Sequence, residues 1–75
     1  MTEDELRKLV ANSLKIPVDE LNGRINEDWD SLDHLSILVR LDAILAGKVS
    51  TIEGIESCFN LSKILNKLKE NGIVK

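Results

Sequence analysis

Cysteine, proline and aromatic residues are scarce in this chain. Its 75 residues include one cysteine, one proline, one tryptophan and one phenylalanine, and no tyrosine. The lone Cys58 excludes an internal disulfide. One cysteine and one histidine without suitable spacing also provide no metal site and no nucleophile arrangement. We expect Cys58 to be a small buried apolar residue.

Positive charge is also in short supply. Lys and Arg together number 10 against 13 Asp and Glu, which leaves a net charge of −3. Binding to phosphate backbones depends on cationic contacts, so this balance argues against nonspecific nucleic-acid binding and against a DNA-binding helix-turn-helix. A mostly acidic surface suits a basic partner.

Long apolar runs are absent as well. No stretch reaches the roughly 20 residues that span a bilayer, and the N-terminus is acidic rather than signal-like. We therefore expect a cytoplasmic protein without stable membrane insertion. The length predicts a single domain over residues 1–75, which we expect to be a monomer. No catalytic constellation is present, so we do not expect an enzyme.

Hydrophobic spacing in the first part of the chain predicts a helix and a long connection. Residues 2–5 match a capping box, and Pro17 stops the helix that follows. Residues 16–30 form the connection, in which residues 18–21 can make one helical turn. We expect the connection to be anchored to the core by Leu21, Ile25 and Trp29.

Residues 31–46 are apolar around most of a helical circumference, which is typical of a central helix. The strictly polar wedge is narrow and holds Asp33, Ser36 and Arg40. Ile37 and Ile44 border this wedge. One broad apolar face is predicted from the 100° helical spacing; it comprises Leu32, Leu35, Leu38, Val39, Leu41 and Leu45.

The last third of the chain predicts two more helices. Gly47 stops the central helix, and residues 50–53 match a second capping box, which predicts a short third helix. Asn60 is predicted to cap a final amphipathic helix that Gly72 ends. The expected fold is therefore all-α, with three longer helices, one short helix and a long first loop.

Ser31 stands at the start of the central helix. A serine at this position is typically an N-cap, although a phosphate joined to its hydroxyl would also be favoured by the helix dipole. The nearby acidic cluster allows two interpretations, a solvated loop or a docking patch for basic partners; it comprises Glu27, Asp28, Asp30 and Asp33. His34 is expected at the surface or at the edge of the core, or in contact with a partner.

Three features together resemble the acyl carrier protein family along essentially the whole chain. They are Asp30-Ser31-Leu32 at a helix start, Pro17-Val18-Asp19-Glu20-Leu21 after the first helix, and the apolar second long helix. The resemblance implies a four-helix bundle of the acyl-carrier type with 4′-phosphopantetheine on Ser31. A phosphopantetheinyl transferase would attach this group from coenzyme A, using Mg²⁺. An acyl or aminoacyl ligase or transferase would then load its thiol.

The chain also departs from the family's usual pattern. Family members of primary fatty-acid synthesis usually have a strongly acidic second helix. Here the polar positions include His34, Ser36 and Arg40, and only Asp33 and Asp42 are acidic. Trp29 stands where small residues are common. These departures indicate a specialised carrier of fatty-acid or secondary-metabolite biosynthesis. The predicted partner-recognition surface comprises Asp30, Leu32, Asp33, Ser36, Ile37, Val39 and Arg40. The alternative is a small helical interaction or adaptor domain that binds a partner through this helix without covalent modification.

Overall fold

The computed structural model describes all residues from 1 to 75 and contains helices and turns but no strand. The four α-helices are α1 (Glu3–Leu14), α2 (Val18–Asn22), α3 (Ser31–Ile44) and α4 (Leu61–Glu70). Two 3₁₀ turns, η1 (Lys48–Thr51) and η2 (Ile55–Ser57), connect α3 to α4. The prediction of an all-α fold with three longer helices is confirmed.

The short α-helix lies before α3 rather than after it. The expected turn at residues 18–21 is α2, whereas the expected third helix is replaced by η1 and η2. The second capping box does not form, because its hydroxyls donate backwards. Ser50 Oγ donates to the Gly47 carbonyl at 3.0 Å, and Thr51 Oγ1 donates to the Lys48 carbonyl at 2.6 Å. This prediction was wrong because a hydroxyl serves equally well as a donor in a turn.

Helix starts elsewhere follow the sequence closely. Thr2 and Glu5 form the complete capping box of α1, with bonds of 3.1 and 3.0 Å. Asn60 caps α4, since its Oδ1 accepts a hydrogen bond from the Lys63 backbone N–H at 2.9 Å. These interactions satisfy backbone donors that a helix leaves unpaired at its N-terminus.

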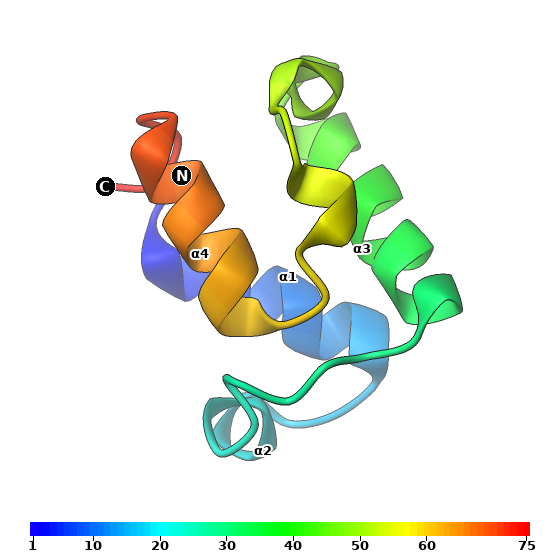
Figure 1. Ribbon diagram of the computed structural model, residues 1–75. Helices are drawn as coiled ribbons and strands as arrows, with labels where there is room; N and C mark the ends of the chain where they lie inside the picture. Colours follow the sequence, from blue (N-terminus) through cyan, green and yellow to red (C-terminus); the bar gives the residue numbers. More distant parts are fainter.

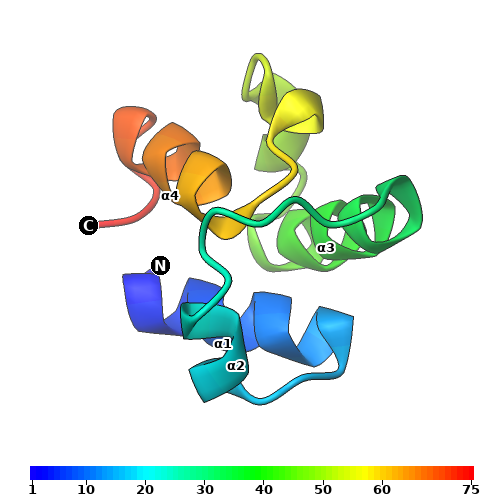
Figure 2. The same cartoon turned by 60° about the horizontal axis from the view of Figure 1, so that its bottom comes forward.

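The helix with most neighbours is α1, which packs against α2, α3 and α4. Figures 1 and 2 show α3 and α4 lying on the same side of α1, with the 3₁₀ turns near them. The expectation that α3 would be the central helix was wrong. The two termini lie close together (Figure 1), and the N-terminal ammonium donates to the Ile73 carbonyl at 3.2 Å.

The core is almost purely aliphatic. Fourteen buried side chains form one cluster that draws on all four helices and both 3₁₀ turns. Cys58 belongs to this cluster, as expected, and burial raises the pKa of its thiol although Lys67 and Lys63 act in the opposite direction. Of the three residues expected to anchor the connection, Leu21 is buried and Trp29 packs against the core, whereas Ile25 is exposed.

Candidate functional site

The start of α3 is capped by Asp30, not by Ser31. Asp30 is in extended conformation, and its Oδ1 accepts a hydrogen bond from the Asp33 backbone N–H at 2.8 Å. Ser31 is the first helical residue, its side chain is exposed, and its hydroxyl forms no hydrogen bond within the protein. The capping role that a serine here would ordinarily fill is therefore taken by the residue before it.

The loop that leads to Ser31 is hydrogen-bonded along its length to the first turn of α4 and to the residues just before it. Ile25 contributes its carbonyl, which accepts a hydrogen bond from the Ser62 N–H at 2.9 Å. The Trp29 backbone N–H donates to the Phe59 carbonyl at 2.8 Å. Figure 2 shows this loop crossing beside the start of α4 on its way to α3. Together with a third hydrogen bond, from Asn60, these bonds order the loop and fix the position of Ser31 at its end.

Asn60 provides the third of these hydrogen bonds to the loop. It is only 5% exposed, and its Nδ2 donates to Asp28 Oδ1 at 2.9 Å while its Oδ1 caps α4. A buried amide with both ends satisfied joins two segments at a defined distance. Asp28 is thus a structural partner of Asn60, in addition to its place in the acidic cluster.

His34 is buried, with 4% of its surface exposed, so its expected position at the surface or the edge of the core was wrong. Its ring contacts both aromatic residues of the chain, with centroid distances of 6.1 Å to Trp29 and 4.5 Å to Phe59. Nδ1 accepts a hydrogen bond from Trp29 Nε1 at 2.9 Å, and Nε2 lies 3.2 Å from the Ile55 carbonyl. The sequence concealed this site because Ile55 is 21 positions away from the histidine. The nearness of the chain's only tryptophan and only histidine was the one local signal.

The residues of the predicted partner-recognition surface are accessible except one, and their role in binding a partner stays a prediction. Asp30, Leu32, Val39 and Arg40 are exposed, and Asp33 and Ser36 are half-buried. Ile37 is completely buried. The buried stripe of α3 consists of His34, Ile37 and Leu41, at positions i, i+3 and i+7.

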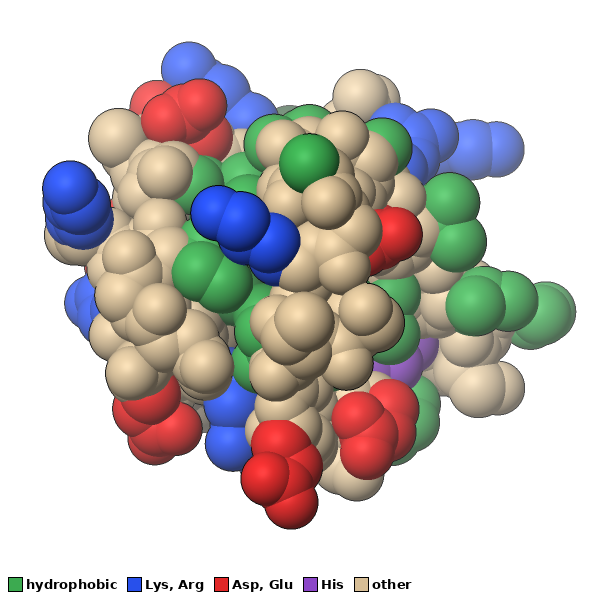
Figure 3. All heavy atoms as spheres, turned by 90° about the horizontal axis from the view of Figure 1, so that it is seen from above, with side chains coloured by type: hydrophobic (Ala, Val, Ile, Leu, Met, Phe, Trp, Pro, Cys, Tyr) green, Lys and Arg blue, Asp and Glu red, His purple; other side chains and the backbone are tan.

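The solvent-exposed face of α3 carries several large apolar side chains. Leu32 is 77% exposed, Leu35 60% and Val39 62%, although all three were assigned to the broad apolar face. Figure 3 shows hydrophobic side chains protruding at the right edge of the molecule, the side on which α3 runs in Figure 1. Because α3 is apolar around most of its circumference, its hydrophobic pattern could not indicate which side would face the core.

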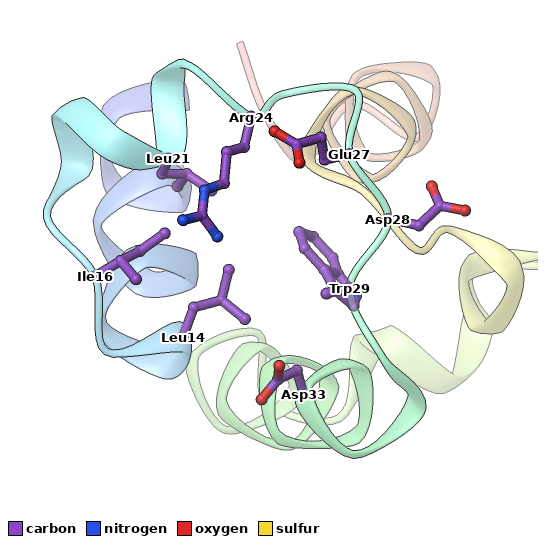
Figure 4. Close-up of a pocket in the computed structure, with 8 residues that line it drawn as sticks. All are labelled: Leu14, Ile16, Leu21, Arg24, Glu27, Asp28, Trp29 and Asp33. Carbon is purple, nitrogen blue, oxygen red and sulfur yellow. The ribbon is translucent and has the colours of Figure 1, made fainter.

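A small cavity lies on the α1 side of the Ser31 loop. Its volume is about 180 Å³, and Figure 4 shows its lining side chains arranged around an open centre. Leu14, Ile16 and Leu21 form the apolar part, and Trp29 faces them across the space. Arg24 lies beside Leu21 and is paired with Glu20 at 2.8 Å. An apolar cavity of about 150 Å³ can hold a molecule of the size of benzene, so this one is too small for a long alkyl chain.

The remaining surface has a groove but no cluster of metal-ligating side chains. No group of three or more His, Cys, Asp or Glu side chains is placed to hold a metal ion. No helix combines the length and the hydropathy needed to cross a bilayer. A wider groove of about 540 Å³ lies between α1 and α3, lined in part by Leu9, Arg40 and Ile44.

Comparison of the chain with family models, with characterised proteins and with solved structures found no match in any of the three. Any functional conclusion therefore depends on the geometry around Ser31 and on the sequence resemblance.

Proposed function

We propose that this protein is a carrier of acyl or aminoacyl groups, with 4′-phosphopantetheine attached to Ser31. The observation that carries the proposal is the division of roles at the start of α3. Asp30 caps the helix, which leaves the exposed Ser31 hydroxyl without a structural partner. The loop before Ser31 is held to the segment before α4 by hydrogen bonds, so the hydroxyl is presented at a defined place.

The residues around Ser31 fit the attached group. The backbone N–H groups of Ser31 and Leu32 have no partner within the protein, and a phosphodiester on the serine would lie beside them at the positive end of the 14-residue helix. When bound, the group supplies a thiol that forms thioesters with the cargo. Nothing bulky covers the hydroxyl, so an enzyme can reach it.

The proposal includes the finer expectations from the resemblance. The helices would form an acyl-carrier-type bundle in which η1 and η2 replace the third helix. Partners would be a phosphopantetheinyl transferase, which uses coenzyme A, and a loading acyl or aminoacyl ligase or transferase. The carrier itself would not be an enzyme, and it would act as a cytoplasmic monomer. The small cavity beside Trp29 favours short cargo over a long alkyl chain if cargo is sheltered there.

The test is an intact-mass measurement after incubation with coenzyme A, Mg²⁺ and a broad-specificity phosphopantetheinyl transferase. The wild type and Ser36→Ala should each gain one phosphopantetheinyl group, and Ser31→Ala should gain none. Ser36 is a matched control because it is another serine on α3. Absence of a gain in folded wild type, with a known carrier modified in parallel, would refute the proposal.

A second candidate is the adaptor domain, which the exposed Leu32, Leu35 and Val39 favour. Several large apolar side chains on one helix face are typical of a protein-binding surface. In that case a partner would bind α3 without any covalent change. Ser31→Ala distinguishes the two candidates, because it would abolish the function of a carrier and leave the binding of an adaptor intact.

A further inference from the structure

Both ring nitrogens of the buried His34 form hydrogen bonds, and the two partners determine which nitrogen carries the proton. The Trp29 indole N–H can only donate, so Nδ1 must accept that bond. The Ile55 carbonyl can only accept, so Nε2 must carry the proton. The two partners therefore fit only the neutral ring in one tautomer. We call this trio of Trp29, His34 and Ile55 the imidazole clasp.

The clasp acts on the two residues that precede Ser31. The indole of Trp29 is bound by the His34 ring, and the Trp29 backbone is bound by Phe59. The backbone N–H of His34 donates to the Asp30 carbonyl at 3.0 Å. Through the Ile55 carbonyl the clasp also connects the loop to η2. The position of Ser31 thus depends on a ring that lies in the core.

We propose that His34 is a positioning residue for Ser31, and that protonation of its imidazole opens the clasp. The positive ring would carry N–H groups on both nitrogens, so that Nδ1–H would face the N–H of Trp29. Two opposed donors cannot form the bond, and Trp29 would leave its place. Lowering the pH drives this protonation, so modification of Ser31 would become pH-dependent. This inference rests on the proposed function for its effect on Ser31, but not for the opening itself.

No charged side chain binds the ring. The segments around it carry Asp28 and Asp30 on the loop, Asp33 on α3 and Glu56 on η2, and none of these forms a hydrogen bond or ion pair with the imidazole. On the segment that follows Ile55, Cys58 donates its thiol proton to the Gly54 carbonyl. Lys63 and Lys67 on α4 act on this thiol and are themselves positive, so they offer no countercharge to the ring. The side chains that α1 and α4 bury in the core are uncharged. No fixed countercharge is bound to a protonated ring, which favours opening over a salt bridge.

The opening is tested first on the unmodified protein, because Trp29 is the only tryptophan. Its fluorescence and its single indole N–H resonance should change in one transition as the pH is lowered from about 8, while far-UV circular dichroism keeps its helical signal. His34→Gln can offer one donor and one acceptor without titrating, so its tryptophan signals should stay constant. Wild-type signals that stay unchanged down to the pH at which the helical signal is lost would overturn the proposal. If His34→Gln does not fold, the wild-type resonance decides alone.

The effect on Ser31 is tested by the rate of phosphopantetheinylation, given as the ratio of wild type to His34→Gln at each pH. The ratio cancels the pH dependence of the transferase. It should fall about fivefold from the start to the end of the tryptophan transition, which corresponds to the loss of one hydrogen bond of roughly 1 kcal/mol. A constant ratio with a changing tryptophan signal would refute the positioning role. Absence of modification at every pH would instead refute the carrier function, with the clasp already tested independently. If His34→Gln does not fold, Trp29→Phe serves as the reference, because it lacks the indole donor.

Discussion

Replacing Asp30 by alanine should destabilise the protein, whereas replacing Ser31 by alanine should leave its stability nearly unchanged. Asp30 Oδ1 is the only side-chain group that caps α3, through its 2.8 Å bond to the Asp33 N–H. Loss of an N-cap costs about 1 kcal/mol. Because the site is exposed, water can replace the lost bond, so the upper end of the usual range of about 2 kcal/mol does not apply.

Such a loss is large enough to measure. A chain of 75 residues has an entropy of unfolding of about 0.16 kcal/mol/K, so 1 kcal/mol lowers Tm by about 6 °C. Ser31→Ala should stay within about 0.5 kcal/mol of wild type, since alanine is the better helix former. Asp30→Asn should lie between them, because asparagine caps a helix equally well but lacks the charge that favours the N-terminus.

Thermal and guanidinium chloride unfolding followed by circular dichroism would give these values for all three variants. The opposite order, with Ser31→Ala losing about 1 kcal/mol and Asp30→Ala unchanged, would refute the capping scheme. It would also remove the observation that supports a free Ser31 hydroxyl. Asp30→Asn then separates a lost cap from a lost charge.

Three further predictions concern the core, the loop and the first helix. Ile37→Ala should lower the free energy of unfolding by about 2–5 kcal/mol, whereas Leu35→Ala on the same helix should cost less than about 1 kcal/mol; equal losses in denaturant unfolding would contradict the assignment of the buried face. Asn60→Ala should cost about 2 kcal/mol, because it removes a helix cap and leaves a buried site without its bond to the loop. Hydrogen exchange should also be faster in residues 25–30 of this variant, and unchanged exchange there would show that the loop does not depend on it. The pKa of Glu5 is lowered from its ordinary 4.5, chiefly because its carboxylate accepts a hydrogen bond from the Thr2 backbone N–H. The ionised carboxylate therefore stabilises the fold above pH 4.5, and this stabilisation is lost as the pH falls through the lower pKa of the folded state. Glu5→Gln keeps an acceptor without titrating, and its Tm should decline less than that of wild type below about pH 4.5; an identical decline would argue against this cause.

Local features of the fold were predictable where neighbouring residues determine them. The capping box of α1 and the Asn60 cap each involve residues three positions apart, so the sequence contains the whole interaction. The second capping box does not form, because the hydroxyls of Ser50 and Thr51 donate to backbone carbonyls three residues earlier instead of accepting from backbone N–H groups. The candidate site was located from Asp30-Ser31-Leu32, but the assignment of the cap to Asp30 needed the backbone conformation.

The amino-acid sequence by itself determined the helical class, most helix boundaries, the acidic balance and the position of Ser31 at a helix start. These follow from hydrophobic spacing, capping and charge, which act over a few residues. Only the tertiary structure decided which side of α3 faces inward. Leu35 and Ile37 are both apolar, and whether one is exposed and the other buried depends on how α1 packs against α3. The burial of His34 was decided in the same way, because its partner Ile55 reaches it only when the chain has folded.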